Sequence, residues 1–519
     1  MHFDKLLKIG LIGAMLLLVS SCNITSPNRE QTDRDNALQA IANWENQKFS
    51  MFIHWGLYSI PAGVWNGEKI SGYSEQIKGH AKIATEEYRK LADQFNPTRW
   101  NADSVAFLAQ RAGMKSIIIT AKHHDGFCMF NSKYTRFDVV DATPYKKDIL
   151  KDLSEACKRY NLKFGVYFSL IDWDYEGATP FVSVRNSDSI PPLHHQYNLN
   201  QVEELLTNYG EVSEIWFDMG SPTYEQSKEI ASLVKKLQPN CLISGRIWND
   251  QGDFVVMGDN LKPDFKMGVP WQTPASMFRE TWSYRSWQER PSVEEKISEK
   301  IHDLISVVSL GGNYLLNIGP KGDGSIVLFE QQVLEGVGKW LQKNGESVYG
   351  TSVAPIDGQN GCLITAKAHK LYIHILTLSN SNKLVIQGIN SKITRAYPLC
   401  DSNVHLETSI SDTELEIDLA NLIKRDKYAT VIVLEYEDEL LYTPKSAIYP
   451  DEQGAYILTY NNATKLHSFS GHDYYSTKPT VVKIKWYLSG KNSEIELSLH
   501  DENNPNRGLS IEELKIKIK

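Results

Sequence analysis

Ile215-Trp216-Phe217-Asp218-Met219-Gly220 is an apolar, aromatic run that ends in one carboxylate close to a glycine. Such a run predicts a buried strand that stops abruptly, with Asp218 at its C-terminal end. In a parallel α/β barrel, reactive groups collect at that end of the strands. Asp218 could instead cap the next helix. We favour a catalytic carboxylate, because a cap does not need two aromatic residues before it.

Strand patterns and helical patterns alternate on both sides of this stretch, over residues 37–345. Predicted strands cover 48–56, 116–120, 163–169, 214–217, 241–246 and 314–319, and predicted helices cover 86–95, 103–113, 148–160, 199–209, 226–237, 293–310 and 333–344. This alternation is typical of a parallel sheet with helical crossovers, and its length suits one (β/α)8 TIM-like barrel. A doubly wound open sheet is the alternative, but the sequence has no GxGxxG motif and no P-loop.

The pattern changes after Ser347, where short alternating strands replace the helices. Strands at 370–376, 383–386, 415–419 and 430–436 predict an antiparallel β-sandwich over residues 346–440. A further small β-rich module is expected over 441–519.

The N-terminus has the layout of a secretory signal, with Lys5 and Lys8 before the apolar run Ile9–Val19 and small residues after it. Cys22 follows them directly, which resembles a bacterial lipobox and implies a lipid on its thiol. A signal anchor is less favoured, because the apolar run is too short. We expect a lipoprotein signal peptide at 1–22 and a polar tether at 23–36. The protein would be exported and anchored to a membrane, in the periplasm or at the cell surface.

Composition excludes several classes of function. The net charge of −8 gives no electrostatic basis for nucleic-acid binding. The five cysteines other than Cys22 are widely spaced without a CxxC pair, so neither a zinc site nor a disulfide scaffold is indicated.

Polar residues end other predicted strands too, namely His54 and the run His123-His124-Asp125. In a barrel they would face the same pocket as Asp218. Adjacent histidines on a strand point to opposite sides and are poor ligands for one metal, so we expect no metal. Neutral imidazoles suit hydrogen bonds to sugar hydroxyls, although one of the pair could be a core histidine.

Three further residues have two interpretations each. Arg246 ends its strand and could pair with a pocket carboxylate or form a structural ion pair. Trp65 and Tyr167 offer apolar faces to a deoxy sugar, or belong to the core.

A nucleophilic Asp218 needs a second carboxyl group as general acid/base, about 5–5.5 Å away in a retaining glycosidase. Glu280 lies in a predicted loop between two strands, where such a group is expected in a barrel. Glu289, Glu75 and Glu68 are rivals, and each could be only a solvated charge.

Four separated motifs together resemble the glycoside hydrolase family 29 α-L-fucosidases. They are Phe52-Ile53-His54-Trp55-Gly56, Lys122-His123-His124-Asp125-Gly126-Phe127, Asn208-Tyr209-Gly210 leading to Trp216-Phe217-Asp218, and the run from Gly311 to Pro320. The resemblance covers roughly residues 37–345, and the predicted sandwich fits the family's usual C-terminal domain. The tail after about residue 441 is not accounted for.

The resemblance implies a retaining exo-glycosidase that releases terminal α-L-fucose from fucosylated oligosaccharides or glycoconjugates, without cofactor or metal. Asp218 falls on the family nucleophile, and His54, His123 and His124 fall on its fucose-binding histidines. Trp65 and Arg246 would line the same pocket, and Trp55, Trp65 or Phe127 would contact the C6 methyl group. Glu280 would be the acid/base, raised in pKa by the neighbouring Asp218.

The chain departs from the family in two places. Many members have Trp-Glu where this chain has Trp271-Gln272, and Glu-Trp-Tyr where it has Glu75-Gln76-Ile77. Two other functions remain as alternatives. One is a non-catalytic glycan-binding lipoprotein without a working acid, and the other is a barrel glycosidase for another sugar, such as galactose.

Overall fold

The computed structural model describes residues 27–176, 189–377, 382–411, 414–444, 446–468, 480–489, 493–501, 504–509 and 514–518. The predicted signal peptide, with Cys22, and residues 23–26 of the predicted tether lie outside these ranges.

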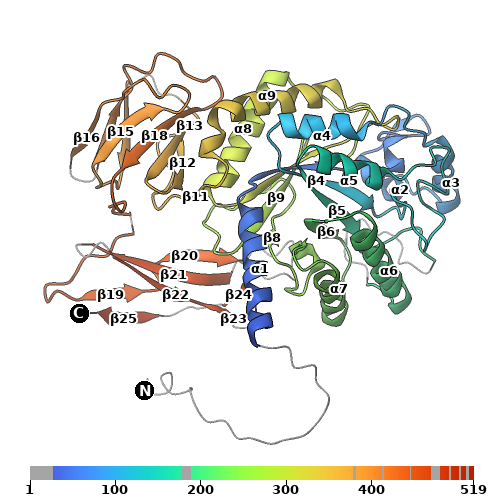
Figure 1. The fold of residues 1–519 in the computed structure, drawn as a ribbon, viewed down its shortest axis with the longest axis horizontal. Helices are drawn as coiled ribbons and strands as arrows, with labels where there is room; N and C mark the ends of the chain where they lie inside the picture. Colours follow the sequence, from blue (N-terminus) through green and yellow to red (C-terminus); the bar gives the residue numbers. More distant parts are fainter. Residues whose placement is uncertain are drawn as a thin grey trace, which may run out of the picture.

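Eight parallel strands form one curled sheet in the order β7-β6-β5-β4-β1-β10-β9-β8 (Figure 1). Its strands are β1 Phe49–Ile53, β4 Ser116–Lys122, β5 Lys163–Ser169, β6 Glu214–Asp218, β7 Leu242–Ile243, β8 Val255–Val256, β9 Trp271–Ser276 and β10 Asn313–Ile318. A single parallel bridge between Ser244 and Phe254 joins the two ends of this sheet. The predicted parallel barrel is therefore confirmed.

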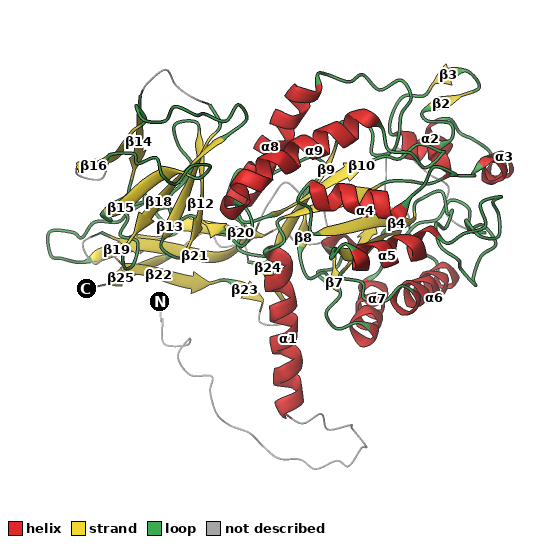
Figure 2. Ribbon diagram, turned by 45° about the horizontal axis from the view of Figure 1, so that its top comes forward, coloured by secondary structure: helices red, strands yellow, loops and turns green. Residues whose placement is uncertain are grey.

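Helices pack around this sheet (Figure 2). They are α4 Ala102–Arg111, α5 Ile149–Arg159, α6 Pro192–Asn208, α7 Tyr224–Leu237, α8 Val293–Ser309 and α9 Leu328–Asn344. Between β7 and β9, in a segment that the structure describes throughout, there is no α-helix. Glycines and prolines interrupt that segment, and both residue types disfavour helix interiors. The ring is thus less complete than an eight-helix barrel.

Smaller elements precede and decorate the barrel. Helix α1 Pro27–Glu45 runs beside it, and β2 Val64–Trp65, β3 Glu68–Lys69, α2 Ile77–His80 and α3 Thr85–Arg89 lie in the connection between β1 and α4. The hairpin of β2 and β3 projects at the barrel's rim (Figure 2).

The end of β6 is shaped by its sequence. A Cβ atom on Gly165 of β5 would lie 2.8 Å from the Glu214 carbonyl oxygen, so glycine lets the two strands approach. After Asp218 the backbone turns through the left-handed region, with φ of 60° at Met219 and 81° at Gly220. Such backbone stops the strand at once and leaves Asp218 at its C-terminal edge.

Antiparallel sheets follow the barrel. One contains β11 Ser352–Val353, β12 Cys362–Lys367, β13 Lys370–Ile375, β18 Thr430–Tyr436 and β15 Ile393–Pro398, and a second contains β14 Lys383–Gln387, β17 Glu414–Asp418 and β16 Thr408–Ser411. They enclose an apolar core of their own. This agrees with the predicted sandwich fold, whereas the domain limits drawn from the sequence stay predictions.

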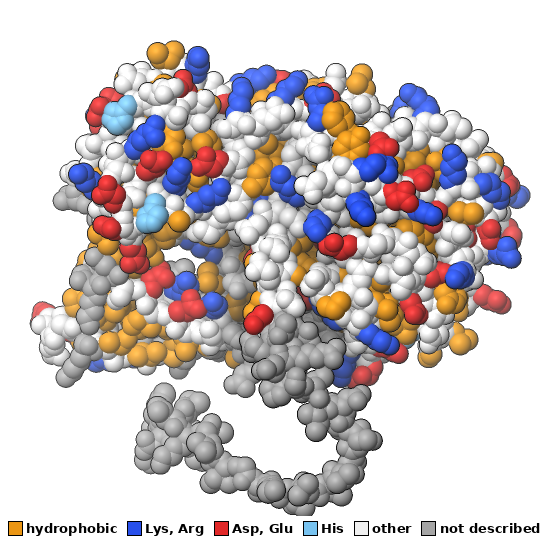
Figure 3. Space-filling view, in the orientation of Figure 1, with side chains coloured by type: hydrophobic (Ala, Val, Ile, Leu, Met, Phe, Trp, Pro, Cys, Tyr) orange, Lys and Arg blue, Asp and Glu red, His pale blue; other side chains and the backbone are white. Residues whose placement is uncertain are grey.

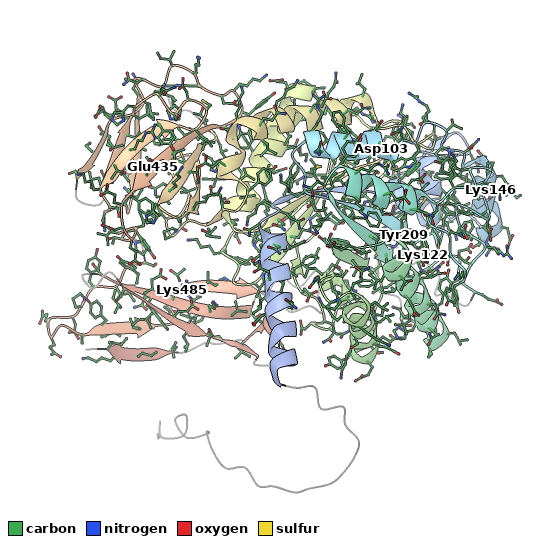
Figure 4. All side chains as sticks on the ribbon, viewed as in Figure 1. Asp103, Lys122, Lys146, Tyr209, Glu435 and Lys485 are labelled. Atoms are coloured by element: carbon green, nitrogen blue, oxygen red, sulfur yellow. The ribbon has the colours of Figure 1, made fainter. Side chains whose placement is uncertain are left out.

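The remaining strands, which we call the terminal module, have a separate core. They are β20 Thr464–Ser468, β21 Thr480–Leu488 and β22 Ser493–Ser498 in one sheet, the pair β19 Tyr456–Thr459 and β25 Lys515–Ile518, and the pair β23 His500–Asp501 and β24 Asn504–Gly508. In Figure 4, Glu435 marks the sandwich and Lys485 marks the terminal module.

Charges of both signs are interspersed over the barrel face in Figure 3, without a continuous basic surface. In the part of the chain that the structure describes, no helix has the length and apolarity needed to cross a membrane.

Candidate active site

Asp218 stands at the C-terminal end of β6 and is held from several sides. Its Oδ1 accepts a hydrogen bond from Arg246 Nη1 at 2.8 Å, and its Oδ2 accepts one from the Tyr167 hydroxyl at 2.8 Å. His124 Nε2 lies 3.8 Å from Oδ2. The carboxylate is thus fixed in orientation, while its side chain stays 16% exposed.

The protonation state of Asp218 follows from these contacts. Burial opposes its ionisation, but the charge of Arg246 and the hydrogen bonds from Arg246 and Tyr167 outweigh that effect. The pKa of Asp218 is therefore held below its usual value. An ionised carboxylate that is partly open to the pocket can act as a nucleophile.

His54, at the end of β1, presents a hydrogen-bond acceptor to the pocket. Asn317 donates its Nδ2 to the Trp282 carbonyl at 2.6 Å, so its Oδ1 faces His54 Nδ1 at 2.7 Å. An amide oxygen cannot donate, and His54 Nδ1 must therefore carry the proton. Burial lowers the pKa of His54 to about 4. The ring is neutral, and its Nε2 is left as an acceptor.

His124 reaches the same state by a different route. The Ser169 hydroxyl donates to the Ile171 carbonyl at 2.7 Å and so accepts from His124 Nδ1 at 2.8 Å. Burial lowers the pKa of His124 to about 4, so its Nε2, which faces Asp218, is an acceptor too. Acceptors of this kind suit the hydroxyl groups of a sugar.

His123 packs among these rings. Its ring centroid is 3.9 Å from that of His124 and 5.5 Å from that of Tyr167. Burial lowers its pKa well below the usual value, and its buried Nδ1 has no protein partner. His123 therefore lies beside His124 and Tyr167, and its predicted role in binding fucose stays a prediction.

Arg246 joins Asp218 to a second carboxylate. Its Nη2 donates to Asp259 Oδ1 at 2.6 Å while its Nη1 binds Asp218, and the guanidinium lies 4.7 Å from the Trp216 ring centroid. Asp259 follows β8, and its side chain is 24% exposed. Two carboxylates that share one guanidinium are close neighbours, and retaining glycosidases need such a pair about 5–5.5 Å apart.

The α-L-fucosidase family model matches residues 17–346. The chain belongs to the α-L-fucosidase family, glycoside hydrolase family 29. It is similar to the tissue α-L-fucosidase of Rattus norvegicus, with 29% identity over 65% of this chain and 76% of the relative. It is also similar to the plasma α-L-fucosidase of Homo sapiens, with 30% identity over 61% of this chain and 70% of the relative.

Solved α-L-fucosidases share the fold. The α-L-fucosidase of Vibrio sp. strain EJY3 superposes with a TM-score of 0.72 and 29% identity, over 86% of this chain and 79% of that one. A family 29 enzyme of Bacteroides thetaiotaomicron, solved as a trapped covalent intermediate with 2-fluoro-fucosyl fluoride, has a TM-score of 0.70 and 27% identity, over 77% of this chain and 96% of that one.

Two carboxylates, Asp218 and Asp259, bind Arg246. Glu280, the predicted acid/base, is not one of them. Its side chain is exposed, and its described hydrogen bond comes from Gln288 Nε2 at 3.3 Å. It lines a cavity of about 570 Å³ together with Thr273 and Ala275 of β9 and residues of α8. Glu280 was predicted from its place in a loop, and it lies in the tight turn in which Phe278 pairs with Thr281.

The three rival glutamates are also placed elsewhere. Glu75 is buried, and its Oε2 accepts hydrogen bonds from the Ser283 amide at 2.9 Å and the Trp282 amide at 3.2 Å. Glu289 lines the same cavity beside β9 and α8 as Glu280, which we call the outer cavity. Glu68 is exposed on the β2–β3 hairpin.

Three of the aromatic residues predicted to contact the sugar lie in different surroundings. Trp55 is fully buried, with its ring centroid 4.5 Å from that of Trp100 and its Nε1 bound to the Lys321 carbonyl. It belongs to a buried apolar cluster, and its contact with the sugar stays a prediction. Tyr167 positions Asp218 through its hydroxyl. Trp65 is partly buried on the β2–β3 hairpin. Its contact with the sugar stays a prediction too.

Asp259 and Asn317 were missed as functional residues. Asp259 ends the run Val255-Val256-Met257-Gly258-Asp259, which resembles the stretch around Asp218 because it also has apolar residues and a glycine close to a carboxylate. A two-residue strand is too short for periodicity to reveal it. Among the described residues, no group of three or more His, Cys, Asp or Glu is arranged to hold a metal ion.

Proposed function

We propose that this protein is a retaining exo-α-L-fucosidase in which Asp218 is the nucleophile and Asp259 is the general acid/base. The observation that carries the proposal is the shared Arg246, which holds both carboxylates at the C-terminal edge of the barrel. Asp259 replaces Glu280 in the role of the acid, because Glu280 lies on the outer cavity.

The reaction has two displacements. Protonated Asp259 gives its proton to the glycosidic oxygen while Asp218 Oδ attacks the anomeric carbon, so that the bond to the aglycone breaks and the aglycone leaves as an alcohol. Asp259, now ionised, removes a proton from water, and the hydroxide oxygen attacks the same carbon from the opposite face to Asp218. The bond between the anomeric carbon and Asp218 Oδ breaks as the water oxygen bonds to that carbon, so fucose is released with retained configuration. Asp218 is again a carboxylate, and Asp259 keeps the proton taken from water.

The substrate's hydroxyl groups meet acceptors in this arrangement. Neutral His54 and His124 each offer Nε2, while Arg246 keeps donors near the two carboxylates. The covalent intermediate trapped in the Bacteroides enzyme supports a double displacement in this family.

The test compares wild type with Asp218→Asn, Asp259→Asn and the matched carboxylate-to-amide control Glu280→Gln. We expect Asp218→Asn to be inactive on all α-L-fucosides. Asp259→Asn should lose about 10²- to 10⁴-fold in kcat/KM on substrates with poor leaving groups. It should keep activity on 2-chloro-4-nitrophenyl α-L-fucoside, with azide accelerating turnover. Glu280→Gln should resemble wild type on both.

Other outcomes would assign other functions. If Glu280→Gln rather than Asp259→Asn shows the dependence on leaving group, Glu280 moves to Asp218 in the complex and Asp259 is not the acid. If wild type cleaves neither aryl fucosides nor fucosylated oligosaccharides but binds them, the protein is a glycan-binding member of the fold. Faster cleavage of α-galactosides would assign another sugar.

We also propose that the protein is exported and tethered to a membrane through a lipid on Cys22. The sequence supports this with its basic, apolar and small-residue order before Cys22. Fucosylated glycans outside the cytoplasm would then be its substrates.

A further inference from the structure

The loop that carries Asp259 lacks the support that a barrel loop normally has. Residues 257–270 connect β8 to β9 without an α-helix, whereas α8 fills the next connection. A long connection without regular structure is expected to open easily unless other parts of the chain hold it.

One end of this loop is tied to the barrel strands. The Met257 amide donates to the Gln272 carbonyl at 3.0 Å, and the Asn260 amide donates to the Pro274 carbonyl at 2.9 Å. The Ser276 amide donates to Asn260 Oδ1 at 2.7 Å. These contacts lie on both sides of Asp259 in the chain. They hold the backbone at Asp259 against β9, where its side chain binds Arg246.

The far part of the loop is tied to the terminal module. The Gly268 amide donates to the His467 carbonyl at 2.9 Å, and the His467 amide donates to the Lys266 carbonyl at 3.2 Å. The rings of Phe265 and His467 lie 4.5 Å apart. Strand β20 thus pairs with the loop through residue 467, and its sheet lies beside β8 in both ribbon views (Figures 1 and 2).

Apolar packing makes this contact continuous with the barrel core. Met267 and Val269 of the loop and Val482 of β21 belong to one buried cluster with the barrel strands. A Cβ atom on Gly268 would lie 2.4 Å from Val482 Cγ2 and 3.0 Å from Leu466 Cβ. The loop backbone at Gly268 therefore packs directly against the side chains of Val482 and Leu466, and a side chain at position 268 would clash with them.

We propose that the terminal module occupies the place of the missing barrel helix and positions the general acid/base, with Gly268 and His467 as positioning residues for Asp259. The inference rests on the proposed role of Asp259. The module would act on proton transfer to the leaving group, and it would leave the binding of fucose by the histidines unchanged.

The experiment is a double-mutant cycle with Gly268→Ala, Val482→Ala and both together in the full chain. The added methyl group must displace the loop from Val482, and Val482→Ala removes the atom that it meets. The readout is kcat/KM on 2-chloro-4-nitrophenyl α-L-fucoside and on a fucosyl disaccharide that wild type cleaves, with thermal unfolding of every variant.

We expect Gly268→Ala to lose about tenfold or more on the disaccharide while kcat/KM on the activated fucoside stays within about twofold, since acid catalysis is needed for the poor leaving group. Val482→Ala alone should change neither, and the double variant should recover the disaccharide activity. Equal losses on both substrates, or no loss in a folded Gly268→Ala protein, would overturn the proposal.

Two further variants keep the outcome decisive. If Gly268→Ala does not fold, Phe265→Ala removes the ring against His467 without adding bulk, and it must show the same selective loss or the proposal fails. Asp259→Asn is measured beside them. If it lacks the dependence on leaving group, the proposed function is at fault. If it shows that dependence and the loop variants do not, only the positioning inference falls.

Discussion

At the scale of the residue, the charge of Arg246 decides how far into acid the nucleophile stays ionised. Burial alone would raise the pKa of Asp218, and the guanidinium reverses that effect. Replacing Arg246 by methionine keeps most of the side chain's length and removes the charge. The pKa of Asp218 should rise, because its ionised form loses its main stabilising partner.

The acidic limb of the kcat/KM profile of Arg246→Met should therefore move to higher pH, with the activity lost first at low pH. The measurement is a pH series on the activated aryl fucoside, where leaving-group protonation contributes least. Arg159→Met, which removes an exterior partner of Asp103, is the matched control and should keep the wild-type profile. An unshifted limb in Arg246→Met would show that Asp218 is not the group that titrates there.

Asn317 acts through His54, because its orientation selects the tautomer that leaves Nε2 as an acceptor. Asn317→Leu removes both hydrogen bonds from a buried site. We expect KM for fucosides to rise by about 5- to 150-fold, as for a loss of about 1–3 kcal/mol. Asn344→Leu is a control, since it removes a buried amide that bonds to the Trp340 carbonyl far from the pocket. A kcat effect without a KM effect would contradict the binding role of His54.

At the scale of the element, strand ends were predictable where the strand was long. Five buried residues precede His54 and four precede Asp218, so the apolar run and its polar end could be read from the sequence. Alternation along β1 also explains why His54 faces the pocket while Trp55 faces Trp100. Asp259 could not be found in this way, because the strand before it has only two residues. Its contact with Arg246 is formed only in the folded protein and leaves no pattern in the sequence.

Glu75 is a buried carboxyl group with a raised pKa whose contacts hold a backbone segment in place. We therefore assign it a structural role and no catalytic one. Burial raises its pKa, while backbone and hydroxyl donors of residues 281–283 bind its oxygens. It thereby holds Trp282, whose ring lies 5.2 Å from that of His54.

Glu75→Gln turns one acceptor into a donor that faces backbone N–H groups. We expect the free energy of unfolding to fall by about 1–3 kcal/mol, and we expect no change in the ratio of kcat/KM between activated and poor leaving groups. Denaturant unfolding and the two-substrate assay measure these. A leaving-group dependence like that expected of Asp259→Asn would instead make Glu75 the acid.

At the scale of the whole molecule, the sequence predicted the parallel barrel and the later antiparallel sheets, since each has its own periodicity. It could not predict that the terminal module fills a gap in the helical ring. That contact joins Gly268 to Val482 and Leu466 across some two hundred residues of chain, and nothing in the local pattern of either segment encodes it. The module that the family resemblance left unexplained is thus the part that touches the loop of Asp259.

The proposed attachment to a membrane belongs to the scale of the whole molecule, and we expect it to be separable from catalysis. In the chain, α1 Pro27–Glu45 lies between Cys22 and the first barrel strand. Cys22→Ala should abolish incorporation of labelled fatty acid and move the protein from the detergent phase to the aqueous phase on phase separation. Its kcat/KM on a soluble aryl fucoside should equal that of wild type. Cys400→Ala, which removes an exposed cysteine of the sandwich, is the matched control and should keep the label. Persistent labelling of Cys22→Ala, or unlabelled wild type in its native host, would refute the lipid anchor.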